Sequence, residues 1–262
     1  MSSQRIELPW DGRRVRIEHR WLRADDAAAP LLVFLHEGLG SVSAWRDFPA
    51  ELCEAVGCRG LVYSRPGYGR STPRAAGETW TPEYMHRQAL ELLPALLRAL
   101  GVEQPPWLFG HSDGGSIALL YAARHAVAGT IVLAPHILVE DLSVESIAQA
   151  RQAWADGDLS ERLARHHDDA ASAFFGWNDV WLSPAFRHWS IEDEIAGIRG
   201  PLLAVQGLDD PYGTLEQIRG IARRVPQTRL LELPDCGHAP HKDQPAAVIA
   251  AVREVMPGRR GR

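Results

Sequence analysis

The chain has 262 residues, of which 45% are hydrophobic and 23% charged, and its formal net charge at pH 7 is −5. This is the size and composition of one soluble α/β domain with a sizeable hydrophobic core. The one run rich in basic residues is residues 259–262 (RRGR), so nucleic acid is not an expected partner. No apolar stretch approaches the roughly 18 residues that a membrane span needs, so no membrane span is expected.

Cysteine content and the first residues indicate the compartment. Cys53, Cys58 and Cys236 form an odd and sparse set, which is typical of a reducing environment rather than of a disulfide framework. The first twenty residues (MSSQRIELPWDGRRVRIEHR) lack the apolar segment of a signal peptide. We therefore expect a cytoplasmic protein.

Short apolar runs alternate with segments of helical periodicity along most of the chain. A hairpin is predicted first, because Asp11-Gly12 lies between two strand-like stretches. Buried strands are then expected at residues 31–35, 60–63, 107–109, 130–133, 202–205 and 230–233. Helices are expected at residues 44–56, 83–100, 116–125, 214–224 and 246–255, with Pro94 kinking or shortening the second. This alternation predicts a mostly parallel sheet covered by helices on both faces.

Residues 139–199 break this rhythm. They are polar, helical in periodicity and rich in large aromatic residues, with no pattern of a buried strand. One interpretation is a helical excursion that packs on its own small core. The interpretation we favour is a helical cap inserted into a single domain of residues 1–262, covering the carboxyl edge of the sheet where α/β proteins place their sites. Trp154, Trp177 and Trp181 are then candidate pocket residues.

The sequence GHSDGG (residues 110–115) lies where a buried strand turns sharply into a helix. A serine at the tip of such a turn has a strained backbone, so its neighbours must be small, as Gly110, Gly114 and Gly115 are. The strain exposes the Ser112 hydroxyl above the sheet, beside the N–H groups of the following helix. A phosphate-binding glycine loop is the alternative, but the Gly-Lys-Ser/Thr sequence and the dinucleotide fingerprint are both missing. Ser112 is therefore a candidate nucleophile, and no cofactor is expected.

This turn resembles the nucleophile elbow of the α/β-hydrolase superfamily, and the resemblance covers nearly the whole chain apart from residues 139–199. It implies an α/β-hydrolase fold and a catalytic acid and histidine, in that order, after Ser112. Asp210, after the strand at 202–205, fits the acid, with Asp209 as the alternative. His238 in CGHAPH fits the histidine, whereas His241 is expected to pack or hydrogen-bond at the start of the last helix. A carboxylate and an imidazole would activate the serine hydroxyl.

The resemblance also implies an oxyanion hole formed by the backbone N–H groups of Gly38 and Asp113. Two acidic side chains are unexpected there, because Glu37 stands where the family usually has glycine and the position of Asp113 is more often neutral. Negative charge at that place would oppose an oxyanion. We expect both side chains to point away and pair with arginines such as Arg65 or Arg70, although Glu37 stays a candidate pocket residue.

The run His166-His167-Asp168-Asp169 is interpreted as a solvated helix face, and no metal site is expected, because ligand-like spacing is absent. The function expected is that of a serine carboxylic-ester hydrolase acting on small or medium esters, with a small-molecule ester as its partner. The alternatives are C–C bond hydrolysis of vinylogous diketones, an aminopeptidase whose acidic residues bind the substrate ammonium, and a non-catalytic binding protein. The intact trio of serine, acid and histidine argues against the last.

Overall fold

A computed structural model describes residues 3–256 of the chain. The basic run at residues 259–262 lies outside the described residues. Within residues 3–256, no helix is both long enough and apolar enough to cross a membrane.

The centre of the fold is an eight-stranded sheet, in the order β1-β2-β4-β3-β5-β6-β7-β8. Its strands are β1 (Gln4–Trp10), β2 (Arg13–Leu22), β3 (Leu31–Leu35), β4 (Arg59–Tyr63), β5 (Trp107–His111), β6 (Gly129–Leu133), β7 (Leu202–Gly207) and β8 (Thr228–Leu233). The first two form the predicted hairpin, in which Asp11 and Gly12 both have positive φ. β2 is antiparallel to β4, and all later pairs are parallel. The predicted mostly parallel sheet is confirmed.

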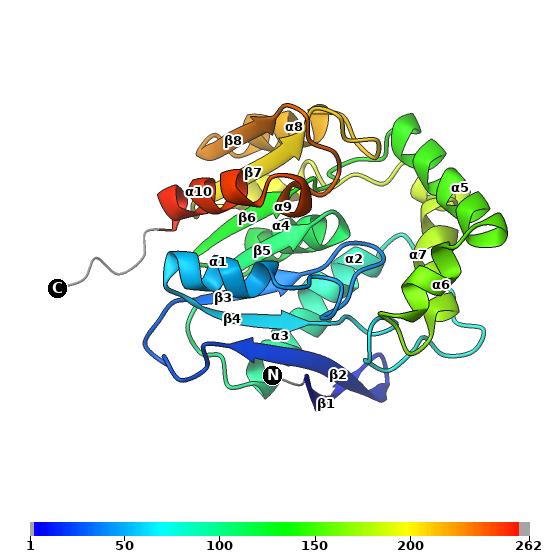
Figure 1. Ribbon diagram of the computed structural model, residues 1–262, viewed down its shortest axis with the longest axis horizontal. Helices are drawn as coiled ribbons and strands as arrows, with labels where there is room; N and C mark the ends of the chain where they lie inside the picture. Colours follow the sequence, from blue (N-terminus) through cyan, green and yellow to red (C-terminus); the bar gives the residue numbers. More distant parts are fainter. Residues whose placement is uncertain (1–2, 257–262) are drawn as a thin grey trace.

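Helices cover both faces of this sheet (Figure 1). On one face lie α1 (Phe48–Val56), α9 (Pro240–Asp243) and α10 (Pro245–Val255); on the other lie α2 (Tyr84–Arg87), α3 (Leu93–Ala99), α4 (Asp113–Arg124) and α8 (Glu216–Arg224). The residues of β3 (LLVFL) show why a central strand can be apolar throughout. Val33 packs into the core on the side of α4, whereas its neighbours Leu32 and Phe34 pack into the core on the side of α1 and α10.

The helix predicted at residues 83–100 is continuous but irregular. A π-helical turn at Gln88–Leu92 joins α2 to α3, and Pro94 follows it in the first turn of α3. Because proline lacks an N–H and clashes with the preceding turn, a wider turn at this place accommodates it without ending the helix.

The chain between β6 and β7 contains α5 (Asp141–Asp156), α6 (Leu159–Ala164), α7 (Ala170–Trp181) and two short 3₁₀ turns, Pro184–Phe186 and Glu194–Gly197. Figure 1 shows α5, α6 and α7 beside the edge at which the parallel strands end. We call residues 139–199 the helical insertion. Its aromatic residues join the core on the α4 side of the sheet rather than forming a core of their own.

Candidate active site

Ser112 is the residue at which β5 turns into α4. Its φ and ψ angles are 52° and −121°, a conformation that costs a residue other than glycine about 1–3 kcal/mol. The flanking glycines are required by space as well: a Cβ at Gly114 would collide with the Leu35 carbonyl, and one at Gly110 with the carbonyl of Gly114. The structure thus has the sharp turn that the sequence predicts, and α4 begins directly after Ser112.

Asp210 and His238 meet at the same edge of the sheet, although they follow different strands. The Nδ1 atom of His238 is 2.9 Å from both carboxylate oxygens of Asp210, and the backbone N–H of Tyr212 donates to Oδ1 at 2.8 Å. Burial alone would raise the pKa of Asp210, but the hydrogen bond from His238 and the N–H of Tyr212 outweigh it and lower the pKa. Asp210 is therefore an ionised partner for the imidazole, whereas Asp209, the alternative, is exposed.

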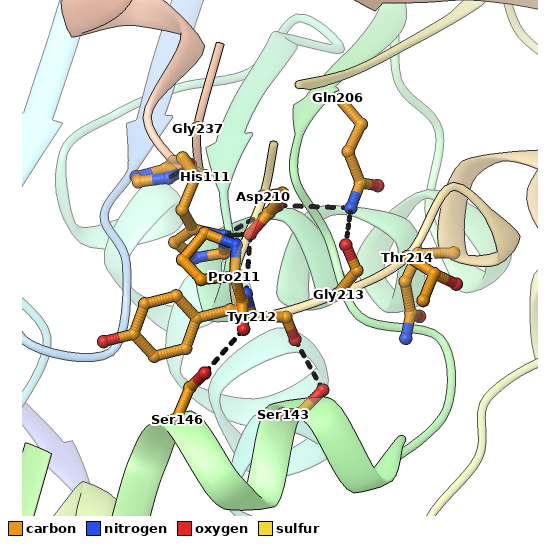
Figure 2. Close-up of polar contacts among 12 residues, drawn as sticks. His111, Ser143, Ser146, Gln206, Asp210, Pro211, Tyr212, Gly213, Thr214 and Gly237 are labelled. Carbon is orange, nitrogen blue, oxygen red and sulfur yellow. Dashed lines mark hydrogen bonds and ion pairs between the residues drawn. The ribbon is translucent and has the colours of Figure 1, made fainter. Parts of the chain in front are cut away.

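Two further groups hold this pair in place. Gln206 donates from Nε2 to Oδ2 of Asp210 at 3.1 Å and to the Gly213 carbonyl at 2.8 Å, as Figure 2 shows. His111, the residue before Ser112, donates from Nε2 to the backbone carbonyl of His238 at 2.7 Å. The turn at Ser112 and the loop that carries His238 are therefore joined directly.

His241 behaves as the sequence predicts. Its ring is buried and packs 4.9 Å from the ring of Trp45 and 5.4 Å from that of Phe48, measured between centroids. It belongs to the core under α9 and takes no part in the contacts of Asp210.

A cavity of about 120 Å³ brings most of the predicted site residues together. It is lined by Glu37, Gly38, Leu39, Ser112, Asp113, His136, Ile147, Trp177, Trp181, Tyr212 and His238. Two of the three candidate tryptophans of the helical insertion thus line it. Trp154 does not: its ring stacks on that of Phe174, with centroids 4.4 Å apart.

The loop after β3, which lines this cavity, is held by hydrogen bonds to one of its backbone carbonyls. The carbonyl oxygen of Glu37 accepts hydrogen bonds from Nδ1 of His36 at 2.7 Å and from the Arg65 guanidinium at 2.8 Å. In a planar trans peptide the N–H points opposite to the carbonyl, so the N–H of Gly38 points away from both donors. The N–H of Asp113 is the first of α4 and has no partner within the helix.

The side chain of Asp113 is buried and lies beside an arginine, one of the two named as possible partners. Its Oδ2 atom accepts a hydrogen bond from the Tyr84 hydroxyl at 2.7 Å and lies 3.7 Å from Arg65, and both charged side chains are fully buried. Trp181 donates to the same hydroxyl at 2.9 Å. Burial raises the pKa of Asp113, and the Arg65 guanidinium opposes that rise. The arginine partner is Arg65, and Arg70 is exposed instead.

Glu37 differs from the prediction. Its side chain is 23% exposed and lines the cavity, and its carboxylate lies 3.6 Å from Nδ1 of His111 rather than beside an arginine. Burial alone would raise the pKa of Glu37, but the imidazole of His111 outweighs it and lowers the pKa well below its ordinary value. A charged carboxylate therefore stands at the rim of the cavity.

The helical insertion is fastened to the loop that carries Asp210. From α5, the Ser143 hydroxyl donates to the Tyr212 carbonyl and the Ser146 hydroxyl to the Pro211 carbonyl, both at 2.5 Å (Figure 2). These bonds couple the position of α5 to the loop that carries Asp210.

The interpretation of residues 166–169 as a solvated helix face is wrong. They lie in the loop between α6 and α7, and His167 is buried. Its Nδ1 accepts from the Gly69 N–H at 2.9 Å, and its Nε2 donates to the Leu39 carbonyl at 3.0 Å. His167 therefore joins the helical insertion to two loops of the sheet. Across residues 3–256, no group of three metal-ligating side chains is placed to hold a metal ion.

Sequence reasoning missed His136 and Tyr212, which both line the cavity. His136 follows the end of β6, so its place after a buried parallel strand was the available signal. Burial lowers the pKa of His136 to about 3, which keeps its imidazole neutral. Tyr212 lies two residues after Asp210, and its ring centroid is 4.7 Å from that of His238.

The order of strand, serine turn, acid and histidine along this sheet is that of the α/β class of hydrolases. The model of the alpha/beta hydrolase family matches residues 32–251, and the chain belongs to this family.

Curated relatives extend the match over most of the chain. The sequence is 27% identical to a 2-succinyl-6-hydroxy-2,4-cyclohexadiene-1-carboxylate synthase of Klebsiella pneumoniae (strain 342), over 87% of this chain and 94% of that protein. It is 26% identical to esterase Rv0045c of Mycobacterium tuberculosis, over 87% of this chain and 83% of that protein. The crystal structure of an enol-lactonase from Burkholderia xenovorans LB400 has a TM-score of 0.73 at 21% identity, covering 96% and 99% of the two chains. That likeness concerns the fold alone.

Proposed function

We propose that the protein is a serine hydrolase that cleaves carboxylic esters of small or medium size through an acyl-enzyme intermediate. Ser112 is the proposed nucleophile, His238 the base and Asp210 the acid. The observation that carries the proposal is the shared cavity: Ser112 and His238 line it, and His238 is hydrogen-bonded to the buried Asp210.

In the proposed reaction, His238 takes the hydroxyl proton of Ser112 as its oxygen attacks the carbonyl carbon of the ester. Asp210 holds the imidazole through Nδ1 and stabilises its charged form. When the tetrahedral intermediate collapses, the bond to the leaving oxygen breaks, and His238 gives the proton to that oxygen. Water then attacks the acyl-enzyme by the same route and releases the carboxylic acid.

The negative oxygen of the intermediate is proposed to bind the N–H groups of Gly38 and Asp113. Each such donor contributes about 3–4 kcal/mol to transition-state stabilisation in comparable sites. The fixed carbonyl of Glu37 supports this role for Gly38, because it determines where the next N–H points. The pairing of Asp113 with Arg65 supports it too, because the guanidinium offsets the negative charge of that carboxylate.

The helical insertion, residues 139–199, is proposed to be a cap that shapes the acyl pocket. Ile147, Trp177 and Trp181 bring apolar surface to the cavity from α5 and α7. An apolar lining favours hydrocarbon acyl groups and excludes water from the acyl-enzyme.

The aminopeptidase alternative is weakened by the same contacts. It needs Glu37 and Asp113 to face a substrate ammonium, but Asp113 is taken up by Arg65 and Tyr84. C–C bond hydrolysis would use the same trio, and no contact favours it. A panel of p-nitrophenyl esters of increasing acyl length, amino-acid anilides and a dienone diketone separates the three activities.

Substitution of the trio tests the proposal. Ser112→Ala should lower kcat for p-nitrophenyl esters by about 10⁴–10⁶-fold with an unchanged thermal midpoint. Combining it with His238→Ala should cost little more, because the two groups act as one unit. Full turnover of an ester by the folded Ser112→Ala protein would refute the assignment.

A further inference from the structure

A second, larger cavity adjoins the one that contains Ser112. It has a volume of about 510 Å³, and Glu37, Leu39, Tyr212 and His238 line both. His238 therefore borders both the small cavity, which Ser112 also lines, and the wide groove, which Ser112 does not line.

The groove is lined by four basic side chains: Arg46, Arg162, Arg165 and Lys242. We call these four residues and the space between them the cationic groove. They come from the segment before α1, from α6 and the residue that ends it, and from α9, so the fold gathers them from distant parts of the chain. All four are exposed. Since the whole chain has a net charge of −5, this concentration of positive charge is local.

Little negative charge offsets these cations. Arg162 pairs with Asp158 at 3.1 Å, whereas the other three form no ion pair within residues 3–256. Among the described residues that line the groove, Glu37 is the one carboxylate, and it lies 3.6 Å from the imidazole of His111. Three basic groups are thus free to bind an anion.

The half-buried His166, which also lines the groove, responds to this charge. Its Nδ1 is 2.9 Å from the Ser43 hydroxyl. Burial is the main cause that lowers the pKa of His166; the positive charges of Arg46, Lys242 and Arg165 lower it further, and the Glu37 carboxylate opposes them. Among the charged groups that act on His166, three are basic and one is acidic.

We propose that the cationic groove binds a phosphate-bearing leaving group, so that the substrates are acyl esters or thioesters of phosphorylated alcohols or thiols. This inference rests on the proposed function. His238 protonates the leaving oxygen or sulfur in that mechanism, so the leaving group must lie beside His238, where the groove begins. The apolar cavity of about 120 Å³ takes the acyl group.

The chemistry of the step is unchanged by the phosphate. Ser112 forms a bond to the acyl carbon, the carbon–oxygen or carbon–sulfur bond breaks, and the proton from Ser112 passes through His238 to the leaving atom. Water then releases the carboxylic acid. Guanidinium and ammonium groups bind phosphate by charge-assisted hydrogen bonds, and several of them around one groove also steer anions into it.

Matched substrate pairs test the inference. Butyryl-coenzyme A is compared with S-butyryl-N-acetylcysteamine, which has the same thioester without phosphates, and a butyryl ester of glycerol 3-phosphate with glycerol monobutyrate. At low salt, kcat/KM should favour at least one phosphate-bearing member by about tenfold or more, mainly through KM, and added salt should reduce the preference. A preference in the thioester pair alone identifies the leaving group as a phosphorylated thiol. A preference in the glycerol ester pair alone identifies it as a phosphorylated alcohol.

Substitutions in the cationic groove test whether the preference for phosphate comes from its basic side chains. Arg165→Gln combined with Lys242→Gln should remove most of the preference while leaving turnover of neutral p-nitrophenyl butyrate unchanged. Arg199→Gln, at an exposed arginine outside the groove, is the matched control and should change neither.

Failure of the groove inference and failure of the proposed function give different results. If neutral esters are cleaved through Ser112 but neither phosphate-bearing member is preferred, or the groove variants slow both members equally, the groove inference is overturned and the proposed function stands. If no ester or thioester is cleaved, or Ser112→Ala retains turnover, the proposed function itself fails.

Discussion

The buried pair of Arg65 and Asp113 allows a quantitative prediction. Their charged atoms are 3.7 Å apart, and both side chains are almost completely shielded from solvent. At an effective dielectric constant of about 20, two unit charges at this separation attract each other by about 4.5 kcal/mol. Removing one partner leaves the other charge buried without compensation, which costs about 3–5 kcal/mol.

Arg65→Met should therefore lower the free energy of unfolding by about 3–5 kcal/mol. Asp113→Asn should cost less, because the guanidinium keeps its bond to the Glu37 carbonyl and lies 4.6 Å from the ring centroid of Tyr68. The double variant should be more stable than the sum of the two losses implies, by about 2–3 kcal/mol. This difference is the interaction energy between Arg65 and Asp113, separated from the other contacts of Arg65.

Urea unfolding followed by circular dichroism measures the free energy of unfolding of the original protein, the two single variants and the double variant. Comparable m-values show that all four expose a similar amount of surface on unfolding. Losses that add within about 0.5 kcal/mol would refute the reasoning, because they would mean that the two charges do not interact in the folded protein.

Two further predictions concern the cavity. Because burial lowers the pKa of His136 to about 3, against about 6.5 in an unfolded chain, the unfolded state binds a proton that the folded state does not as the pH falls below 6.5. The free energy of unfolding should lose about 2 kcal/mol from this residue at pH 5, and His136→Gln should abolish that part; an unchanged pH dependence in urea titrations would contradict it. A Cβ at Gly38 would collide with the Trp177 indole, so Gly38→Ala should lower kcat/KM for p-nitrophenyl butyrate about 10²-fold or more. Adding Trp177→Ala should restore part of the loss by removing the collision, and no recovery would point to another cause.

The positions of Ser112, Asp210 and His238 at the end of the sheet were predictable, because each follows from a short local sequence pattern. A turn as sharp as that at Ser112 requires glycines around it, and Asp210 and His238 both follow short apolar strands. Parallel strands end at one edge, so residues far apart in sequence can be expected to meet there. Their catalytic roles stay predictions, although their placement agrees with them.

Other features depend on packing that the sequence does not reveal. Arg65 and Arg70 are equally basic and close in sequence, but Arg65 lies just after β4 and is buried against Asp113, which follows β5. His167 reads as a polar residue in a polar run, yet its ring bonds two distant loops.

The orientation of the helical insertion also depends on packing that the sequence does not reveal. Trp154 and Trp177 are both tryptophans of the helical insertion, and which of them faces the cavity depends on how α5 and α7 pack against the rest of the protein. Helical periodicity identifies these helices but not the surface that each tryptophan meets.

Labelling with an active-site phosphorylating reagent tests the central claim most directly. Diethyl p-nitrophenyl phosphate should react once per chain, releasing one p-nitrophenolate, and mass spectrometry of the digested protein should find the diethylphosphoryl group on Ser112. His238→Ala should slow the labelling by several orders of magnitude, because the serine then lacks its base. A group found on another residue, or equal labelling of the folded Ser112→Ala protein, would contradict Ser112 as the nucleophile.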